Sequence, residues 1–242
     1  MTLAARELCV AGRLAGVSVE LRAGELTAIC GPNGAGKSSL LQCLAGLLEP
    51  GSGEIALGEM PLAMVRAKAR AQAIGYLAQH DEVAWDLAVE ALVALGRLPH
   101  GDAGEAEVAA ALAALDLTAL AHRRVSTLSG GERARALLAR VLAGTPDWIL
   151  ADEPLAPLDL AHQLALLSHL RTAARGGAGV VIALHDLALA MNHADRAVVL
   201  HMGKVVADAA PEQALDPRTI ARAWGVDVRW LGEPGARALV AR

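Results

Sequence analysis

Gly31-Pro32-Asn33-Gly34-Ala35-Gly36-Lys37-Ser38 is the stretch that decides the fold of this chain, because it matches the phosphate-loop pattern G-x-x-x-x-G-K-[ST]. An apolar strand is predicted before it, at Leu26–Cys30, and leucines recur at helical spacing after it. Glycines allow backbone N–H groups to point inward around a polyphosphate, and the start of the next helix adds partial positive charge. We therefore predict that a nucleotide's phosphates are bound here, by Gly31, Pro32, Asn33, Gly34, Ala35, Gly36, Lys37, Ser38 and Ser39.

Two side chains at the end of this loop have specific predicted roles. Lys37 is expected to reach the β- and γ-phosphates, and Ser38 is expected to bind Mg²⁺. The helix that begins here is predicted to carry five leucines on one face before Pro50–Gly53 closes the unit: Leu40, Leu41, Leu44, Leu47 and Leu48.

A second segment, Trp148–Glu153, reads as an apolar strand that ends in two acids. By itself this pattern also fits a solvated strand end. If the strand is buried beside the phosphate loop, however, its two carboxylates lie next to the metal ion. We then predict that Asp152 binds Mg²⁺ and that Glu153 polarises the attacking water as a general base.

A third motif, Leu128-Ser129-Gly130-Gly131-Glu132, opens a predicted amphipathic helix. A capping box between Ser129 and Glu132 accounts for the serine but not for the two glycines. A Ser-Gly-Gly run at a helix start exposes N–H groups and a hydroxyl at the positive end of the helix, so Ser129, Gly130 and Gly131 are predicted to form a second phosphate site. One chain has no use for two such sites on one nucleotide, so we expect them to come from different copies of the chain.

The rest of the pattern predicts one α/β domain of 242 residues, because short apolar strands alternate with helical stretches, as in a mainly parallel sheet. Between about residues 79 and 143 the strand pattern gives way to amphipathic helices. We predict a P-loop NTPase core formed by residues 1–79 and 146–242, with a helical subdomain inserted at 80–145. Other predicted features are strands at Val17–Leu21, Ile74–Leu77, Trp148–Ala151 and Val180–Leu184, two short helices after Pro211 with Pro217 near a start, and a hairpin around Leu231–Gly235.

Composition constrains where such a chain works. Hydrophobic residues make up 54% of it, yet no apolar run approaches the roughly 18 residues of a membrane-spanning helix. Arg6 and Glu7 interrupt the N-terminal stretch where a signal peptide would be apolar. The net charge of −4 provides no basic footprint for a nucleic acid. We expect an intracellular protein without a nucleic-acid partner, whose three cysteines (Cys9, Cys30 and Cys43) are reduced.

Taken in order, the motifs resemble those of the nucleotide-binding subunits of ATP-binding cassette (ABC) transporters over nearly the whole chain. The resemblance implies an ATPase that uses ATP and Mg²⁺ and works as a head-to-tail homodimer. It also implies roles for three more residues. Gln79 corresponds to the Q-loop glutamine that senses Mg²⁺ and the attacking water, Asp159 to the D-loop aspartate, and His185 to the switch histidine that contacts the γ-phosphate.

The same resemblance implies that the chain drives a separate membrane permease from the cytoplasmic face of the inner (plasma) membrane. The residues just after Gln79 mix charge with an aromatic, Trp85, as a docking groove for that permease would. The alternative is that Trp85 packs under the helical subdomain. Two departures from the family pattern stand out. The region Val10–Leu14 lacks the usual aromatic that stacks on adenine, which leaves Arg13 as the substitute, and Leu155-Ala156-Pro157 replaces small hydroxylated residues.

Four further stretches are similar to importers of iron-siderophores, haem and cobalamin: Val93–His100, Leu158–Gln163, His185–Ala190 and Ala223–Val226. This similarity implies uptake of a metal chelate delivered by a periplasmic substrate-binding protein. Gly12–Leu14 is similar to cobalamin subunits and Gly96–Pro99 to iron-chelate subunits, and of the two we favour the iron chelates.

Two alternatives belong to other functional classes. A soluble ABC ATPase of iron–sulfur cluster assembly has a similar length but lacks a stretch like Gly96–His100. A DNA-repair or chromosome-organising ABC ATPase has a long coiled coil between the phosphate loop and the Ser-Gly-Gly motif. The segment from Lys37 to Gly130 is too short for such a coiled coil and contains no sustained heptads.

Overall fold

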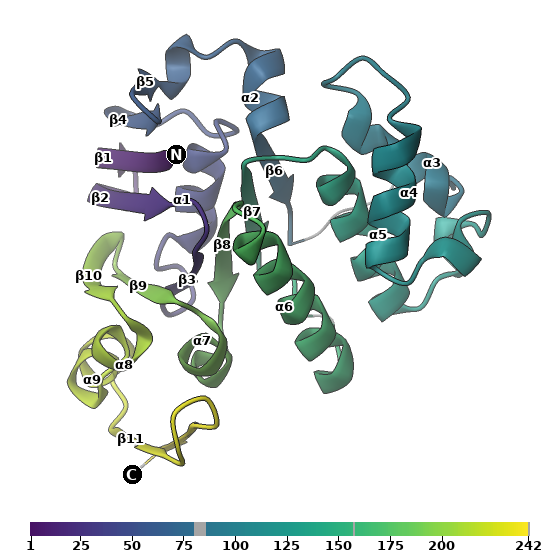
Figure 1. Cartoon of the computed structure of the whole chain (residues 1–242). Coiled ribbons are helices and arrows are strands. Elements are labelled where there is room, and N and C mark those ends of the chain that lie inside the picture. Colours follow the sequence, from purple (N-terminus) through teal and green to yellow (C-terminus); the bar gives the residue numbers. More distant parts are fainter. Residues whose placement is uncertain (80–85, 157, 242) are drawn as a thin grey trace.

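A central, mainly parallel sheet organises the protein (Figure 1), whose computed structural model describes residues 1–79, 86–156 and 158–241. The five strands β9, β3, β8, β7 and β6 run parallel, and β10 pairs antiparallel with β9 at one edge. This confirms the predicted α/β class. In sheet order the strands are β10 (Lys204–Ala209), β9 (Arg196–His201), β3 (Leu26–Cys30), β8 (Gly179–Leu184), β7 (Trp148–Asp152) and β6 (Ile74–Leu77).

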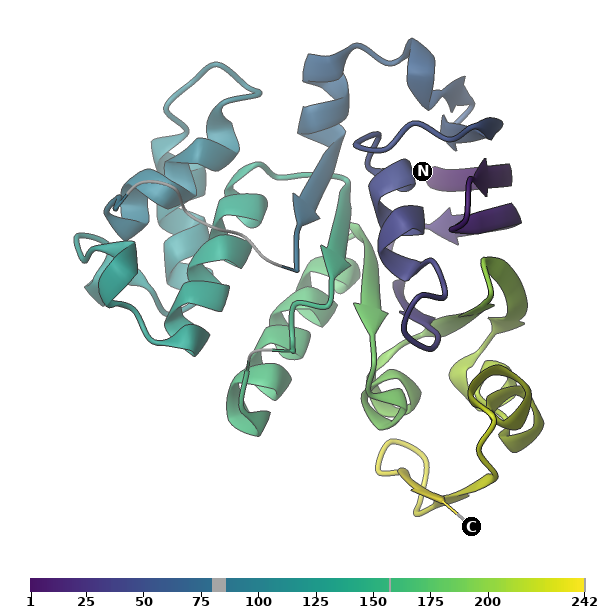
Figure 2. The same cartoon turned by 180° about the vertical axis from the view of Figure 1, so that it is seen from behind.

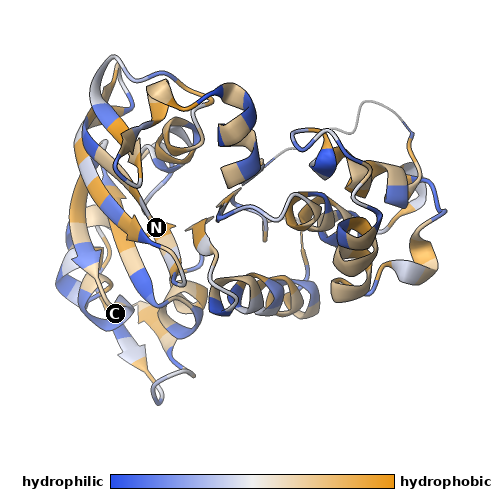
Figure 3. Cartoon of the chain, turned by 45° about the horizontal axis from the view of Figure 1, so that its top comes forward, coloured by the Kyte–Doolittle hydropathy of each residue, from blue (hydrophilic) through white to orange (hydrophobic). Residues whose placement is uncertain are grey.

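A smaller antiparallel sheet, which the sequence patterns did not predict as a unit, covers one side of the core. Its strands are β2 (Leu14–Arg22), β1 (Thr2–Val10), β4 (Ser52–Leu57) and β5 (Met60–Pro61). Buried and exposed residues alternate along β2, and the alternation of hydrophobic and hydrophilic residues in such strands is visible in Figure 3. The helix α1 (Lys37–Leu44) lies between the two sheets, in contact with β1 on one side and with β7 and β8 on the other.

Two apolar clusters pack against the central sheet, one on each face. Along β3, Ile29 belongs to the cluster around α1, whereas Ala28 and Cys30 belong to the cluster on the opposite face. This alternation follows from the period of two residues in a strand. The opposite face is covered by α6 (Leu160–Arg175) and α7 (Leu187–His193) (Figure 1).

A group of helices lies to one side of the sheet, beyond β6, and is seen from behind in Figure 2. It contains α3 (Val89–Ala94), α4 (Glu105–Ala114) and α5 (Gly130–Ala143), which contact one another. Among the described residues of this segment, the only strand-type pairing is a single bridge between Ala88 and Arg124. The segment is helical, as expected; its bounds as a subdomain remain a prediction. None of the helices that the structure describes is long and apolar enough to cross a membrane.

The C-terminal elements follow the prediction closely. Two short helices, α8 (Pro211–Ala214) and α9 (Pro217–Trp224), precede a hairpin of β11 (Val228–Leu231) and β12 (Ala238–Ala241). The Asp216 carboxylate accepts hydrogen bonds from two N–H groups in the first turn of α9. One further helix, α2 (Ala67–Ala73), leads into β6.

The predicted extent of the first helix is wrong at its end. Leucine spacing predicted a helical face reaching Leu48, but α1 ends at Leu44. Gly46 adopts a left-handed backbone (φ 68°), and the Leu47 N–H donates to the Gln42 carbonyl, while Leu47 itself is 64% exposed. With the bond from the Gly46 N–H to the Cys43 carbonyl, this forms a Schellman motif, which ends a helix at a glycine whatever the apolar spacing beyond it.

Candidate nucleotide site

The phosphate loop connects β3 to α1 and packs closely on two neighbouring segments. Gly36 precedes α1 with a φ of 104°, and a Cβ atom there would lie 2.6 Å from the Arg13 carbonyl oxygen. A Cβ at Gly31 would lie 2.4 Å from the Leu200 carbonyl oxygen of β9. These two glycines therefore allow the loop to sit against the β1–β2 connection and the end of β9.

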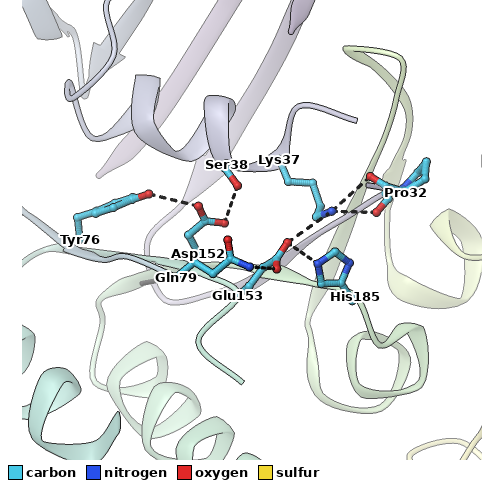
Figure 4. Close-up of polar contacts among 9 residues, drawn as sticks. Pro32, Lys37, Ser38, Tyr76, Gln79, Asp152, Glu153 and His185 are labelled. Carbon is cyan, nitrogen blue, oxygen red and sulfur yellow. Dashed lines mark hydrogen bonds and ion pairs between the residues drawn. The ribbon is translucent and has the colours of Figure 1, made fainter. Parts of the chain in front are cut away.

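Lys37, the first residue of α1, is folded back over the loop. Its Nζ donates to the carbonyl oxygens of Gly31 (3.0 Å) and Pro32 (3.4 Å). The same nitrogen lies 3.7 Å from Glu153 Oε1, and the lysine side chain is only 5% exposed (Figure 4). The loop thus holds a buried positive charge beside the place where phosphates are predicted to bind.

Asp152 ends β7 directly beneath the start of α1. Its carboxylate accepts hydrogen bonds from Ser38 Oγ (3.0 Å) and from Tyr76 Oη (3.4 Å) (Figure 4). Burial raises the pKa of Asp152, the Ser38 hydrogen bond opposes this shift, and the neighbouring charge of Glu153 adds to it. A hydroxyl and a carboxylate held 3.0 Å apart are oxygen donors of the kind that Mg²⁺ prefers.

Glu153 is where the remaining predicted polar side chains meet. Gln79 Nε2 donates to its Oε2 at 2.6 Å, and His185 Nε2 lies 2.5 Å from its Oε1 (Figure 4). The residue has a φ of 50°, a conformation that costs a non-glycine residue about 1–3 kcal/mol and is concentrated at functional sites. Three separate segments, which follow β6, β7 and β8, therefore converge on one largely buried carboxylate.

A cavity of about 500 Å³ opens over this cluster. Most of the predicted phosphate-loop residues line it together with the three proposed catalytic side chains, and Gly12 and Arg13 line it from the β1–β2 connection. The lining residues are Gly12, Arg13, Asn33, Gly34, Ala35, Gly36, Lys37, Ser38, Ser39, Gln79, Glu153 and His185.

The other predicted phosphate ligands lie on different helices and do not line this cavity. Ser129 caps α5 and forms the predicted capping box, since its N–H donates to Glu132 Oε2 (2.8 Å) while its Oγ accepts from the Glu132 N–H (3.2 Å). Gly130 and Gly131 are the first two residues of α5, and Asp159 caps α6. A single copy therefore keeps the two predicted phosphate sites apart.

Sequence reasoning missed two features of this cluster. Tyr76, the only tyrosine of the chain, bonds to Asp152 from the neighbouring strand, where it pairs with Leu150. A lone tyrosine in an apolar strand just before Gln79 was the available signal. The ion pair between Lys37 and Glu153 had no signal, because the two residues are brought together only by the sheet. The permease-docking hypothesis for Trp85 concerns residues 80–85 and lies outside the described residues.

Comparison with known proteins supplies the family. The sequence model described as "ABC transporter" matches residues 14–156, which is more than half of the chain. The chain belongs to the ABC transporter family. This confirms the family and the fold predicted from the order of the motifs, and it makes the protein an ATPase coupled to transmembrane transport, with ATP as its nucleotide.

Close relatives extend over nearly the full length of this ABC ATPase. The hemin import ATP-binding protein HmuV of Myxococcus xanthus is 42% identical over 240 residues, which cover 93% of this chain and 90% of that protein. The protein of the same name from Pseudomonas aeruginosa is 44% identical over 223 residues, which cover 89% of this chain and 88% of that protein. A solved structure of a metal-chelate type ABC transporter in an inward-facing conformation matches with a TM-score of 0.84 and 25% identity, over 100% of this chain and 97% of that one. The alternative of iron–sulfur cluster assembly is not favoured by these relatives.

Proposed function

We propose that this chain is the ATP-hydrolysing subunit of an importer that takes up haem. The observation that carries the proposal is the similarity, at 38–44% identity over most of the chain, to several ATP-binding proteins named for hemin import. The likeness to a metal-chelate transporter points the same way. Haem is itself an iron chelate. The proposal therefore selects haem as the substrate among the three candidates, which were iron-siderophores, haem and cobalamin.

The catalytic roles proposed from the sequence fit the geometry around Glu153. In hydrolysis, Glu153 is the general base: it takes a proton from the water that attacks the γ-phosphorus, while the bond from that phosphorus to the bridging oxygen breaks and ADP leaves. Gln79 and His185 hold the two oxygens of this carboxylate from opposite sides. Because Lys37 is already beside Glu153, arriving phosphates draw the ammonium away from the carboxylate and leave the base free to act.

A divalent cation fits the oxygen donors beside the loop. The Ser38 hydroxyl and the Asp152 carboxylate already contact each other and would hold the cation. Gln79, whose amide nitrogen bonds to Glu153, would offer its carbonyl oxygen as a third ligand. When bound with ATP, Mg²⁺ neutralises charge that develops on the phosphates.

The separation of the two phosphate sites supports a head-to-tail homodimer. In a two-fold pairing, Ser129, Gly130 and Gly131 of one copy face the nucleotide held by the phosphate loop of the other, and Asp159 contributes from the same side. We further propose that this dimer acts at the cytoplasmic face of the inner membrane, on permease subunits that receive haem from a periplasmic binding protein.

The substrate is tested by growth of a deletion strain on defined iron sources. Loss of the chain is expected to abolish growth on haem as sole iron source, while growth on a ferric siderophore continues; Glu153→Gln should fail to restore growth on haem. Normal growth on haem with loss of growth on the siderophore would assign the chain to a siderophore importer instead.

A further inference from the structure

His162 lies where the start of α5 meets the start of α6. A Cβ atom built on Gly131 would sit 2.2 Å from Cδ2 and 2.5 Å from Nε2 of this imidazole. Gly131 does not have a positive φ, so its backbone conformation does not demand a glycine. What disfavours a larger residue is the His162 ring, which lies against the Gly131 Cα and would have to move for a methyl group.

The opposite edge of the same ring is tied to Asp159. His162 Nδ1 lies 2.7 Å from Asp159 Oδ1, which also accepts the His162 backbone N–H at 3.0 Å. The segment before Asp159 is held by a neighbouring side chain. Gln163 Nε2 donates to the carbonyl oxygens of Leu155 and Leu158, both at 3.1 Å. A carboxylate partner at Nδ1 fixes both the tautomer and the orientation of an imidazole.

The ring contacts a buried glycine, Gly131, and a carboxylate, and the residues around this contact are exposed. Asp159 is 68% exposed, and Ser129 and Gly130 are exposed beside Gly131. No described residue accepts the N–H of Gly130 or Gly131, as expected for the first turn of a helix. One imidazole thus connects an exposed carboxylate with the start of a helix at which Ser129 and Gly130 are exposed and two N–H groups have no acceptor among the described residues.

We propose that His162 is a positioning residue that holds Asp159 and the start of α5 in a fixed relation, so that both reach the partner copy's nucleotide together. It acts through these two groups and does not itself touch the nucleotide. The proposal rests on the head-to-tail homodimer proposed above. The plain alternative is a helix cap, in which the ring's contact with Gly131 has no consequence for catalysis.

The contact itself is tested within one chain, without reference to the dimer. Gly131→Ala, His162→Ala and the double variant are compared by thermal unfolding. Because an alanine methyl at 131 would overlap the ring, Gly131→Ala should lower the melting temperature when His162 is present and lower it much less in the His162→Ala background. An equal loss in both backgrounds would show that the ring does not occupy this space and would overturn the proposal.

Positioning is separated from capping by His162→Asn. The asparagine amide can replace Nδ1 towards Asp159, but it has no ring to cover Gly131. A helix cap alone predicts wild-type hydrolysis, whereas positioning predicts a kcat lower by about 10- to 100-fold, the range expected for a small misplacement of reacting groups. The ATP Kd of the monomer and the melting temperature should stay near wild type.

His169→Asn is the matched control, because His169 lies on the same helix about two turns further on, and it should hydrolyse ATP normally. A wild-type kcat for folded His162→Asn would overturn the proposal. If the proposed dimer does not form, the result is distinguishable. The specific activity of the wild-type protein would then not depend on its concentration, while the unfolding results for the Gly131 and His162 variants would stay as described. In that case His162 has a packing role only, and positioning towards a partner is excluded.

Discussion

At the scale of single residues, the site depends on one buried carboxylate with three polar neighbours. Glu153 contacts Gln79, His185 and Lys37 at 2.6, 2.5 and 3.7 Å, so its position is determined from three directions. Such a carboxylate has a fixed position, and once the Lys37 ammonium turns to the phosphates it can orient and deprotonate a water molecule, as a general base must.

Glu153→Gln keeps the size and hydrogen-bonding reach of the side chain but removes the proposed base. We expect kcat to fall by roughly 10²- to 10⁴-fold while ATP still binds, and we expect the ATP-bound dimer to accumulate. Lys37→Ala is the contrasting variant, because it should weaken ATP binding itself. Measuring both the turnover and the ATP Kd separates them. If Glu153→Gln hydrolyses ATP near the wild-type rate, the base is another group, and His185 becomes the candidate.

At the scale of elements, the phosphate loop is shaped by what lies behind it. Gly34 and Gly36 both have positive φ, 77° and 104°, but only Gly36 lies against other backbone atoms. Gly34→Ala should cost about 1–3 kcal/mol of unfolding free energy through conformational strain alone. Gly36→Ala should cost more, because its methyl would overlap the Arg13 carbonyl. Urea unfolding of the nucleotide-free protein measures both, and equal losses would contradict this account of the loop.

Local patterns predicted the elements that carry chemistry better than their surroundings. The strand Leu26–Cys30 and the acids at the end of β7 follow from short runs of residues, as does the cap at Ser129. The end of α1 was mispredicted because leucine spacing continues past Gly46, where the backbone turns left-handed. The antiparallel sheet was missed because its pairings, such as β1 with β4, join segments that only the folded chain brings together.

At the scale of the whole molecule, the placement of the two predicted phosphate sites is the central feature. The cavity over Glu153 is lined from the phosphate loop and the ends of the central strands, whereas Ser129–Gly131 and Asp159 begin helices elsewhere. The sequence predicted both motifs and predicted that they serve different copies of the chain, but it did not indicate which elements hold them apart within one copy. The head-to-tail dimer that we propose would unite them and would give each nucleotide two contributing chains.

Complementation between two defective chains tests this dimer most directly. Lys37→Ala removes the loop's positive charge, and Ser129→Arg blocks the second site, so each variant alone should be nearly inactive. In an equimolar mixture, each mixed dimer contains one site with an intact loop and an intact Ser129, so about a quarter of the wild-type activity should return. Lys37→Ala mixed with the double variant is the control without a competent site. A mixture no more active than its separate components, with both proteins folded and dimeric, would contradict the account.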